Sequence, residues 1–279
     1  MIDQPAVLGP ASKTKPICLE CLKGPLQVDE ECPRCPQCSF PLCSEACLAL
    51  KTLHSDEECR ILSASGLGKL ALDGAPEEEM MMVYCCIFLL RTWLLKSQSE
   101  ATWRRLDFLM DGNTRDLMDE DSFTVEIANI MQAKMGLTQL TREEIVKLMG
   151  IKRTNASTLL AVGLPGTYTV VKNYQKSLIF STDFVSLLGA TGLYPVYNLM
   201  NSFCTCNTRC SIEESQGYSM VVRAQTYIKK GEQITTRYCP PWEGQPKRVD
   251  QLWKHWQFIC HCDRCQDPTE FGTYFSALK

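Results

Sequence analysis

Hydrophobic and polar positions divide the chain into three zones with different expected structures. Residues 18–59 have little apolar periodicity and are rich in cysteine, proline and turn residues. Residues 76 to about 150 have the pattern of helices, whereas residues from about 155 to 265 are strand-like. Within this third zone, residues 218–238 contain two β-rich runs joined by a Lys-Lys-Gly-Glu turn at 229–232. The pattern predicts a cysteine-rich N-terminal segment, followed in the sequence by helices and then by strands.

Two sequence signals mark helix starts in the middle zone. Pro76 and the three glutamates after it form a favourable first turn, and Thr141 with Glu144 makes a capping box ahead of Gly150. The longest apolar stretch, residues 80–90, is followed by an arginine and is too short to span a bilayer. We expect it to be a buried helix, and we expect no association with a membrane.

The composition is typical of a globular protein, and the net charge limits the classes of partner that it is expected to bind. The chain has 279 residues, of which 45% are hydrophobic and 22% charged, and its net charge is −3. A slightly acidic chain shows no sign of a phosphate-binding surface, so no direct nucleic-acid binding is expected. Residues 1–16 lack the apolar region of a secretory signal. The 17 cysteines are therefore expected to be reduced and to bind metal, the alternative being a secreted disulfide scaffold.

Cysteines at zinc-ligand spacing fill the first zone. Short C-x2-C and C-x3-C steps place two thiolates on one ion, and seven cysteines with one histidine suffice for two closed tetrahedral sites. Because so short a segment has almost no core of its own, metal binding would also supply its folding energy. Cys32 complicates the pairing, since it precedes Cys35 and Cys38 at the same spacing; we favour the latter two and treat Cys32 as spare. The eight predicted ligands are Cys18, Cys21, Cys35, Cys38, Cys43, Cys47, His54 and Cys59.

A second group of cysteines lies near the C-terminus, in the run WQFICHCDRC. Its C-x-C-x2-C pattern supplies three thiolates, one short of a closed zinc site. The missing ligand has to come from another part of the sequence, and the stretch NSFCTCNTRC at 201–210 offers three candidates. The cysteines of the run are Cys260, Cys262 and Cys265, and the three candidates are Cys204, Cys206 and Cys210.

These motifs resemble those of the SMYD family, the protein-lysine methyltransferases that combine a SET domain with a MYND zinc finger. The cysteine pattern of 18–59 is similar to the finger. The C-terminal run is similar to a post-SET zinc site, which borrows one cysteine from an Asn-His-Ser-Cys motif; Asn201 and Cys204 match the two ends of that motif. The segments GLYPVYNLMNSFCTCNTR and VVRAQTYIKKGEQITTRY agree, and the tail DPTEFGTYFSALK is similar to the arthropod SmydA or msta-like group.

The resemblance implies an α+β fold, a SET-type β-fold split by a MYND zinc finger and a helical insert and completed by a post-SET zinc site. A remnant of the N-terminal SET segment would occupy 1–17 and the finger 18–59. A helical SET insert would occupy 60–154 and the core SET domain 155–240. The post-SET region and the start of a C-terminal region would occupy 241–279. Relatives begin with a Gly-x-Gly strand and continue beyond this C-terminus, so the chain is expected to be truncated at both ends.

The resemblance also assigns the ligands of three zinc ions. In the finger the ligand pairs interleave between two ions. His54 lies one place earlier than the family's usual H-x3-C spacing, which makes it the least secure ligand. The expected sets are Cys18, Cys21, Cys43 and Cys47; Cys35, Cys38, His54 and Cys59; and, for the post-SET ion, Cys204, Cys260, Cys262 and Cys265.

The activity implied by the resemblance is methyl transfer from S-adenosyl-L-methionine to a lysine of a protein substrate. Tyr238 matches the active-site tyrosine, whose hydroxyl could orient the amine and the methyl group. Trp256 occupies a position usually held by tyrosine, which keeps an aromatic face but loses a hydroxyl. The positions matched to cofactor contacts are Asn155, Asn201, Ser202, Tyr238, Trp256 and Phe258.

Several departures leave the enzymatic status open. Ser202 replaces the motif's histidine, and Phe203 replaces a small serine and is expected to crowd the same wall. The family has no counterpart for the long segment at 159–190. A chain without the Gly-x-Gly turn is expected to bind the cofactor poorly.

Two alternatives to a working enzyme follow. The first is a catalytically impaired relative acting as an adaptor in transcriptional regulation, in the nucleus or the cytoplasm, whose finger presents a groove to proline-containing peptides. The second is a redox- or zinc-responsive scaffold that uses the six unassigned cysteines. These are Cys32, Cys85, Cys86, Cys206, Cys210 and Cys239.

Overall fold

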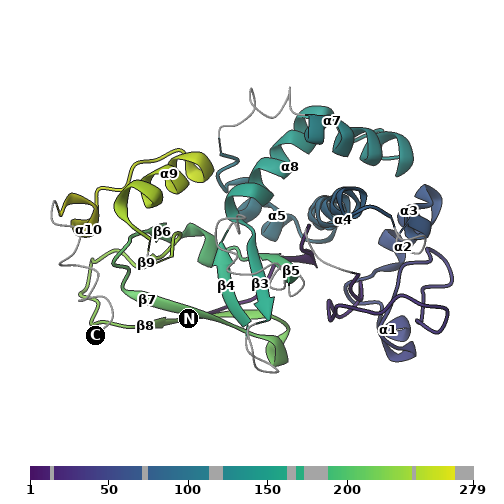
Figure 1. Ribbon diagram of the computed structural model, residues 1–279, viewed down its shortest axis with the longest axis horizontal. Coiled ribbons are helices and arrows are strands. Elements are labelled where there is room, and N and C mark those ends of the chain that lie inside the picture. The colour runs from purple at the N-terminus through teal and green to yellow at the C-terminus, as the bar shows by residue number, and fades with distance from the viewer. Residues whose placement is uncertain are drawn as a thin grey trace.

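The computed structural model describes residues 1–12, 16–70, 75–112, 122–161, 168–172, 188–240 and 243–267 (Figure 1). In the view of Figure 1 the main sheet lies low and central, most of the long helices lie above it, and the cysteine-rich N-terminal segment lies at the right. Helices and strands together confirm the predicted α+β class. Most of the segment 159–190 and the tail after residue 267 lie outside the described residues.

The main sheet has seven antiparallel strands and is built from distant parts of the chain. Its order is β1-β8-β7-β4-β3-β5-β2. The two edge strands β1 and β2 are separated by only three residues, so the sheet has to curl until its two edges approach each other. The strands are β1 Ile2–Asp3, β2 Val7–Pro10, β3 Ser157–Ala161, β4 Tyr168–Lys172, β5 Leu188–Leu193, β7 Thr208–Glu213 and β8 Ser219–Ala224.

A separate two-stranded parallel sheet is formed by β6 (Asn201–Ser202) and β9 (Thr235–Thr236). The two runs predicted within 218–238 therefore do not pair with each other. The first run forms β8, which pairs with β7 and β1, and the second forms only β9. The turn between them is present, since the Glu232 amide donates to the Lys229 carbonyl at 3.0 Å.

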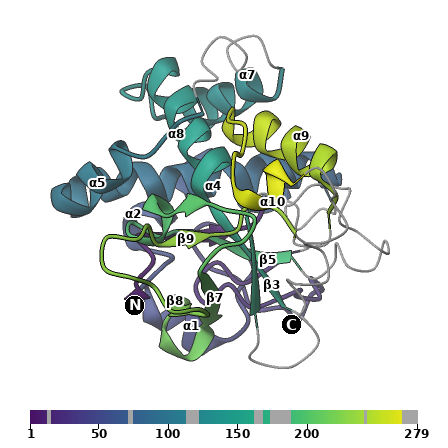
Figure 2. The same cartoon turned by 90° about the vertical axis from the view of Figure 1, so that its left-hand side faces the viewer.

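The helices divide into a small N-terminal set, a central set and a C-terminal pair. Figure 2 shows the C-terminal pair, α9 and α10, on the side of the molecule that carries β9. The N-terminal set is α1 Glu45–Leu50, α2 Asp56–Ser65 and α3 Leu67–Leu70. The central set is α4 Glu77–Gln98, α5 Glu100–Asp107, α7 Ser122–Asn129 with its π-helical continuation η1 Ile130–Lys134, and α8 Arg142–Asn155. The C-terminal pair is α9 Gln245–Trp256 and α10 Asp263–Gln266.

Helix α4 forms the centre of the largest hydrophobic core, as the apolar stretch at 80–90 predicts. By length and composition alone it could cross a membrane, but most of its side chains are buried inside the protein. A helix that is apolar on nearly every side is stable in water only when other elements surround it. Strand β2 packs closely on it, because a Cβ on Gly9 would lie 2.9 Å from Phe88 Cδ2.

The predicted capping box at the start of α8 is confirmed. Thr141 Oγ1 accepts from the Glu144 amide at 3.2 Å, and Glu144 Oε2 accepts from the Thr141 amide at 3.0 Å. The helix does not stop near Gly150 but continues to Asn155. Gly150 allows close contact with the loop after α5, since a Cβ there would lie 2.2 Å from the Asp111 carbonyl oxygen.

The expectation that residues 155 to 265 are strand-like throughout is wrong for α9. This helix has Pro246 in its first turn, and Gly244 precedes it as the N-cap. Its buried side chains Arg248, Leu252 and Trp256 recur every four residues, which is the helical period. The polar composition of the segment and a buried arginine conceal that period from a count of apolar residues.

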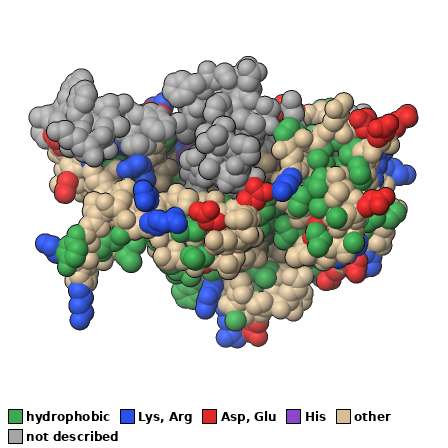
Figure 3. Space-filling view, turned by 90° about the horizontal axis from the view of Figure 1, so that it is seen from below, with side chains coloured by type: hydrophobic (Ala, Val, Ile, Leu, Met, Phe, Trp, Pro, Cys, Tyr) green, Lys and Arg blue, Asp and Glu red, His purple; other side chains and the backbone are tan. Residues whose placement is uncertain are grey.

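Charged side chains of both signs are interspersed on the face seen in Figure 3. Lys and Arg lie near Asp and Glu over most of the described part of this face. Apolar side chains are more frequent toward the right, the end at which Figure 1 places α1 and α2. This face therefore presents a mixed surface rather than a single field of one sign.

Candidate functional site

Three groups of four metal-binding side chains come together among the described residues. Within each group the ligand atoms all lie within 4.8 Å of one another. Two groups belong to the N-terminal segment, and the third joins cysteines that are 56 and 61 positions apart. They are Cys18, Cys21, Cys43 and Cys47; Cys35, Cys38, His54 and Cys59; and Cys204, Cys260, Cys262 and Cys265. These are the three sets that the sequence predicts as zinc ligands.

The distances between ligand atoms fit a metal ion better than disulfide bonds. Cys35 Sγ lies 3.4 Å from Cys59 Sγ, and Cys204 Sγ lies 3.5 Å from Cys265 Sγ and 4.0 Å from Cys260 Sγ. Four sulfurs about 2.3 Å from a tetrahedral zinc ion lie about 3.8 Å apart, whereas a disulfide bond is about 2.05 Å long. All 17 cysteines are free.

Individual thiols in these groups favour the thiolate form that a metal requires. A hydrogen bond from Cys21 lowers the pKa of Cys18 to about 5. Burial opposes ionisation of Cys262, but hydrogen bonds from the backbone of Cys265 and Cys204 lower its pKa to about 7. Because thiolates are the zinc-binding species, the donor sets fit this ion in chemistry as well as in spacing.

His54 is oriented by a buried network of charges. Its Nε2 lies 3.3 Å from Cys38 Sγ, and its Nδ1 lies 2.8 Å from Glu58 Oε1. Glu58 in turn accepts from Arg91 Nη2 at 2.8 Å. Burial opposes ionisation of Glu58, but the Arg91 guanidinium holds the pKa of the carboxyl below its usual range. A carboxylate on Nδ1 fixes the ring so that Nε2 faces the metal, which places a ligand at the unusual sequence spacing.

Two buried arginines lie beside the third group. Arg248 is 2% exposed, and its Nη2 lies 3.5 Å from Cys265 Sγ. Arg264 is 3% exposed, and both guanidinium groups donate to the Glu243 backbone carbonyl. Four thiolates around a divalent ion carry a net negative charge, and buried cations need such a partner. The arginines therefore fit a zinc tetrathiolate and not four neutral thiols.

A cavity of about 580 Å³ adjoins the third group. It lies among the loop after α5, the end of α8, residues 198–203 and the segment that follows α9. Its volume is in the usual range for small-molecule and cofactor sites, about 300–1,000 Å³. Aromatic and amide side chains in its lining are Tyr238, Trp256 and Phe258, and Asn155, Asn198 and Asn201.

Tyr238 and Trp256 form one fixed aromatic wall of this cavity. The Tyr238 hydroxyl donates to the Met200 carbonyl at 2.8 Å, and Trp256 Nε1 donates to the Thr154 carbonyl at 2.8 Å. The ring centroids lie 4.7 Å apart with a tilt of 36°. Burial raises the pKa of Tyr238 to about 12, so the phenol keeps its proton at neutral pH.

Comparison with known proteins finds sequence similarity to SET-domain proteins. No family model matches it. The SET domain-containing protein SmydA-8, isoform A, of Drosophila melanogaster is 44% identical over 87 residues, which is 31% of this chain and 18% of that protein. The human Histone-lysine N-methyltransferase SMYD3 is 25% identical over 255 residues, 90% of this chain and 51% of that protein. These similarities, together with the three ligand groups, support placement of the chain in the SMYD family.

Coverage of these relatives is partial. The human Protein-lysine N-methyltransferase SMYD4 is 28% identical over 145 residues, which is 51% of this chain and 17% of that protein. The chain spans about half of SMYD3 and less of the other two. Together with the three ligand groups, this similarity confirms the fold class, a SET-type fold with MYND and post-SET zinc sites.

Ser202, which stands in place of the family's histidine, has a structural contact. Its Oγ accepts from the Tyr238 amide at 3.3 Å and so ties β6 to Tyr238, two residues after the end of β9. Phe203 also lines the cavity and is 38% exposed. Its amide donates to the Thr236 carbonyl at 2.9 Å, which extends the contact between the β6 and β9 segments.

The other predicted cofactor residues also line the cavity. The side-chain amide of Asn155, however, is hydrogen-bonded within the protein. Asn155 Nδ2 donates to the Met110 carbonyl at 2.7 Å and to the Ile151 carbonyl at 3.0 Å. Both amide hydrogens therefore serve to join the end of α8 to the loop after α5. Asn201 is exposed in the lining, and Phe258 is half-buried there.

Several lining residues are absent from the sequence prediction, and four of them come from two places in the chain. Phe108, Leu109 and Met110 lie in the loop after α5, and Asn198 precedes the motif by three residues. The three loop residues carry no motif and reach the cavity only through tertiary packing. An asparagine in an otherwise apolar stretch was a signal for the fourth.

The six cysteines outside the ligand groups make separate contacts. Cys206 Sγ lies 3.2 Å from the Thr208 carbonyl, and Cys210 Sγ lies 3.6 Å from Thr236 Oγ1. Cys32 Sγ faces backbone carbonyls at 3.7 and 3.9 Å, outside the neighbouring ligand group. Cys85, Cys86 and Cys239 are buried. The redox-scaffold hypothesis for these six cysteines stays a prediction.

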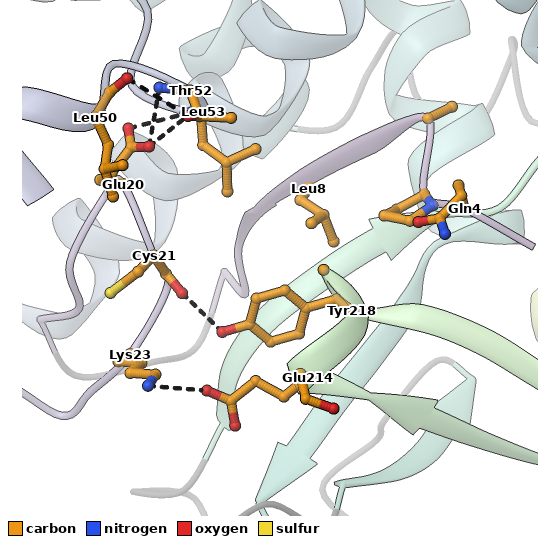
Figure 4. A pocket seen from close by; sticks show the side chains of 14 residues that line it. Gln4, Leu8, Glu20, Cys21, Lys23, Leu50, Thr52, Leu53, Glu214 and Tyr218 are labelled. Carbon is orange, nitrogen blue, oxygen red and sulfur yellow. Dashed lines mark hydrogen bonds and ion pairs between the residues drawn. The ribbon is translucent and has the colours of Figure 1, made fainter.

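A second cavity, of about 820 Å³, lies between the finger and the sheet (Figure 4). Its polar groups are paired within the protein: the Tyr218 hydroxyl donates to the Cys21 carbonyl at 2.7 Å, and Lys23 Nζ lies 3.3 Å from Glu214 Oε1. Glu20 accepts from three consecutive backbone amides, including that of His54 at 2.8 Å. These contacts join the two zinc sites of the finger to the sheet.

Proposed function

We propose that the chain is a protein-lysine N-methyltransferase that uses S-adenosyl-L-methionine, with three structural zinc ions. The observation that carries the proposal is the cavity in which the Tyr238 hydroxyl, an aromatic wall and the Asn201 side chain meet beside the Cys204 ligand group. Its volume and lining suit a cofactor with an adenine ring. The SMYD3 and SMYD4 relatives are named as lysine N-methyltransferases, which supports the same reaction.

In this proposal the protein positions two reactants and excludes water. The cofactor supplies an activated methyl group. Tyr238, whose hydroxyl is held by the Met200 carbonyl and stays protonated, presents its oxygen to the amine of the substrate. Phe258 and Trp256 offer faces for stacking, and orientation of this kind supplies much of the rate of a two-reactant transfer.

The remaining assignments are part of the same proposal. The finger occupies 18–59, the helical insert 60–154, the SET core 155–240 and the post-SET region 241–279. The boundary at 59/60 falls inside α2, so the finger and the insert share a helix. The partner is a protein substrate, met in the nucleus or the cytoplasm. Binding of proline-containing peptides by the finger stays a prediction.

Titration of the purified protein with S-adenosyl-L-methionine tests the proposal. Isothermal titration is expected to give saturable binding, and Phe258→Ala is expected to weaken it by about tenfold because a stacking face is lost. Trp253→Ala is the matched control, since Trp253 lies on the same C-terminal segment but is 55% exposed and outside the cavity. Absence of binding up to millimolar cofactor would refute the proposal for this chain.

Removal of the Tyr238 hydroxyl is expected to impair transfer more than cofactor binding. Tyr238→Phe keeps the ring that packs on Trp256 but loses the group that orients the amine. Transfer of labelled methyl groups to core histones should fall by about a hundredfold, with cofactor affinity changed less than threefold. An unchanged rate would show that Tyr238 only packs in the core.

A further inference from the structure

Asn198 has a buried side-chain amide for which the described part of the chain offers no hydrogen-bond partner. Its side chain is 6% exposed, and neither Nδ2 nor Oδ1 forms a hydrogen bond with any described residue. Burying such a group without partners destabilises a protein, and nearly all buried polar groups are therefore paired. Asn198 lines the same cavity as Tyr238 and Asn201. An unpaired amide in a cavity lining indicates a ligand that completes it.

The backbone that carries Asn198 is held firmly in place. Asn198 lies in the 3₁₀ turn Tyr197–Leu199, and its own amide donates to the Tyr194 carbonyl at 2.9 Å. The Asp3 carboxylate accepts from the Val196 and Tyr197 amides at 2.9 and 2.7 Å. A side chain on so constrained a turn cannot easily move to find a partner elsewhere, so the unpaired amide is a fixed feature of the cavity.

The turn also places Asn198 near the reacting end of the cavity. Met200, two residues later, is the C-cap of this turn, and its carbonyl accepts the hydroxyl of Tyr238. The amide and the phenol therefore belong to one short segment of wall. Both residues line the same cavity, which allows one ligand nitrogen to be assigned to both.

We propose that Asn198 Oδ1 accepts a hydrogen bond from the amine of the substrate lysine and limits the reaction to two methyl groups; this rests on the proposed methyltransferase function. An amine offers N–H donors, so Oδ1 is the end of the amide that pairs with it. In each transfer the nitrogen lone pair forms the N–C bond while the S–C bond of the sulfonium breaks. Sulfur keeps the bonding electrons, and the nitrogen releases one proton to solvent.

The limit of two follows from counting N–H bonds. A neutral primary amine has two, a monomethylated amine has one, and a dimethylated amine has none. The lone pair of each must face the methyl donor, so only the first two can also donate to Asn198. A dimethylamine would place a methyl group against Asn198 Oδ1, which would then be buried without a hydrogen bond. The bound dimethylamine is less stable by the free energy of that hydrogen bond. A third transfer is therefore disfavoured.

Two small cations of equal charge test the hydrogen bond without turnover. n-Butylammonium has three N–H bonds and n-butyltrimethylammonium has none, and both resemble the end of a lysine side chain. In NMR titrations without cofactor, the protein is expected to bind the first about tenfold more tightly. Asn198→Leu, which keeps the size of the side chain, is expected to bring this ratio close to one. Equal binding of the two cations by the unchanged protein, or binding of neither, refutes the proposal.

A stability measurement separates a ligand site from a structural one. Because the Asn198 side chain forms no hydrogen bond with any of the described residues, Asn198→Leu is expected to leave the melting temperature unchanged or to raise it. A variant that melts several degrees lower would show that the amide supports the fold, and the proposal would be wrong. Tyr197→Leu is the contrasting variant, since Tyr197 Oη lies 3.4 Å from Thr236 Oγ1 in the core and its loss should lower the melting temperature.

The count of methyl groups on core histones provides the second arm. Mass spectrometry is expected to show mono- and dimethyllysine with the unchanged protein and additional trimethyllysine with Asn198→Leu. Trimethyllysine from the unchanged protein would overturn the proposal even where the methyltransferase function holds. Conversely, a protein that fails to bind S-adenosyl-L-methionine refutes the proposed function, while the two cations still decide whether Asn198 binds an amine.

Discussion

Replacing Cys204 with serine is expected to remove one of three bound zinc ions and to lower the melting temperature. Cys204 is the only ligand of its group that lies outside the C-terminal run, so it ties that run to the strand β6 segment. A hydroxyl is a poor substitute for a thiolate, and a three-thiolate site is open to solvent. Loss of the ion would leave Arg248 and Arg264 buried without their negative partner, which adds to the loss of stability.

Metal analysis and thermal unfolding measure this effect together. The unchanged protein is expected to hold three zinc ions per chain, and Cys204→Ser two. Cys206→Ser is the matched control, because Cys206 is also buried and lies two residues away, but its Sγ contacts the Thr208 carbonyl and Gln225 and is not part of the ligand group. This control should keep all three ions. Full zinc content in Cys204→Ser would show that the third group does not hold a metal.

Replacing Arg91 with methionine is expected to cost about 3–5 kcal/mol of unfolding free energy, the usual loss when one partner of a buried ion pair is removed. Arg91 donates to Glu58, and also to the carbonyls of Leu8 and Leu19 at 3.0 and 2.8 Å. It therefore holds strand β2, the finger and helix α4 together. Methionine would leave the Glu58 carboxylate buried without a counter-charge and would free the His54 ring.

Urea unfolding measures this loss of free energy. Two further variants test whether it comes from the buried charge left without a partner. Arg104→Ala removes an exposed i,i+4 pair with Glu100 and should change stability by less than about 1 kcal/mol. The double variant Glu58→Gln, Arg91→Met should recover part of the loss, since no unpaired charge remains. A loss below 1 kcal/mol in Arg91→Met would show that the network contributes little to the fold.

The zinc ligands were the most predictable feature, because their chemistry is local. Short cysteine steps such as that of Cys18 and Cys21 specify pairs of ligands whatever the surrounding fold. The capping box of Thr141 and Glu144 and the buried helix at 80–90 were predictable for the same reason. Helix α9 was missed because Arg248, a polar residue, occupies a core position where distant groups, Cys265 Sγ and the Glu243 carbonyl, pair with its guanidinium.

The residues that complete the site depended on long-range packing. Ser202 could be recognised as a departure from the family motif, but its hydrogen bond to the Tyr238 amide depends on the parallel pairing of β6 with β9. Met110 reaches the cavity because Gly150 lets the α5 loop approach α8. No neighbouring residue in the sequence carries that information.

By itself the sequence determined the pairs of zinc ligands in the finger and the starts of helices α4 and α8, because each depends on residues a few positions apart. Only the tertiary structure decided that Asp3, from the first strand, holds the turn of Asn198, and that this amide is left unpaired in a cavity. Whether a buried polar group has a partner depends on every element packed around it. Those elements come from distant parts of the sequence and contact one another only in the folded protein.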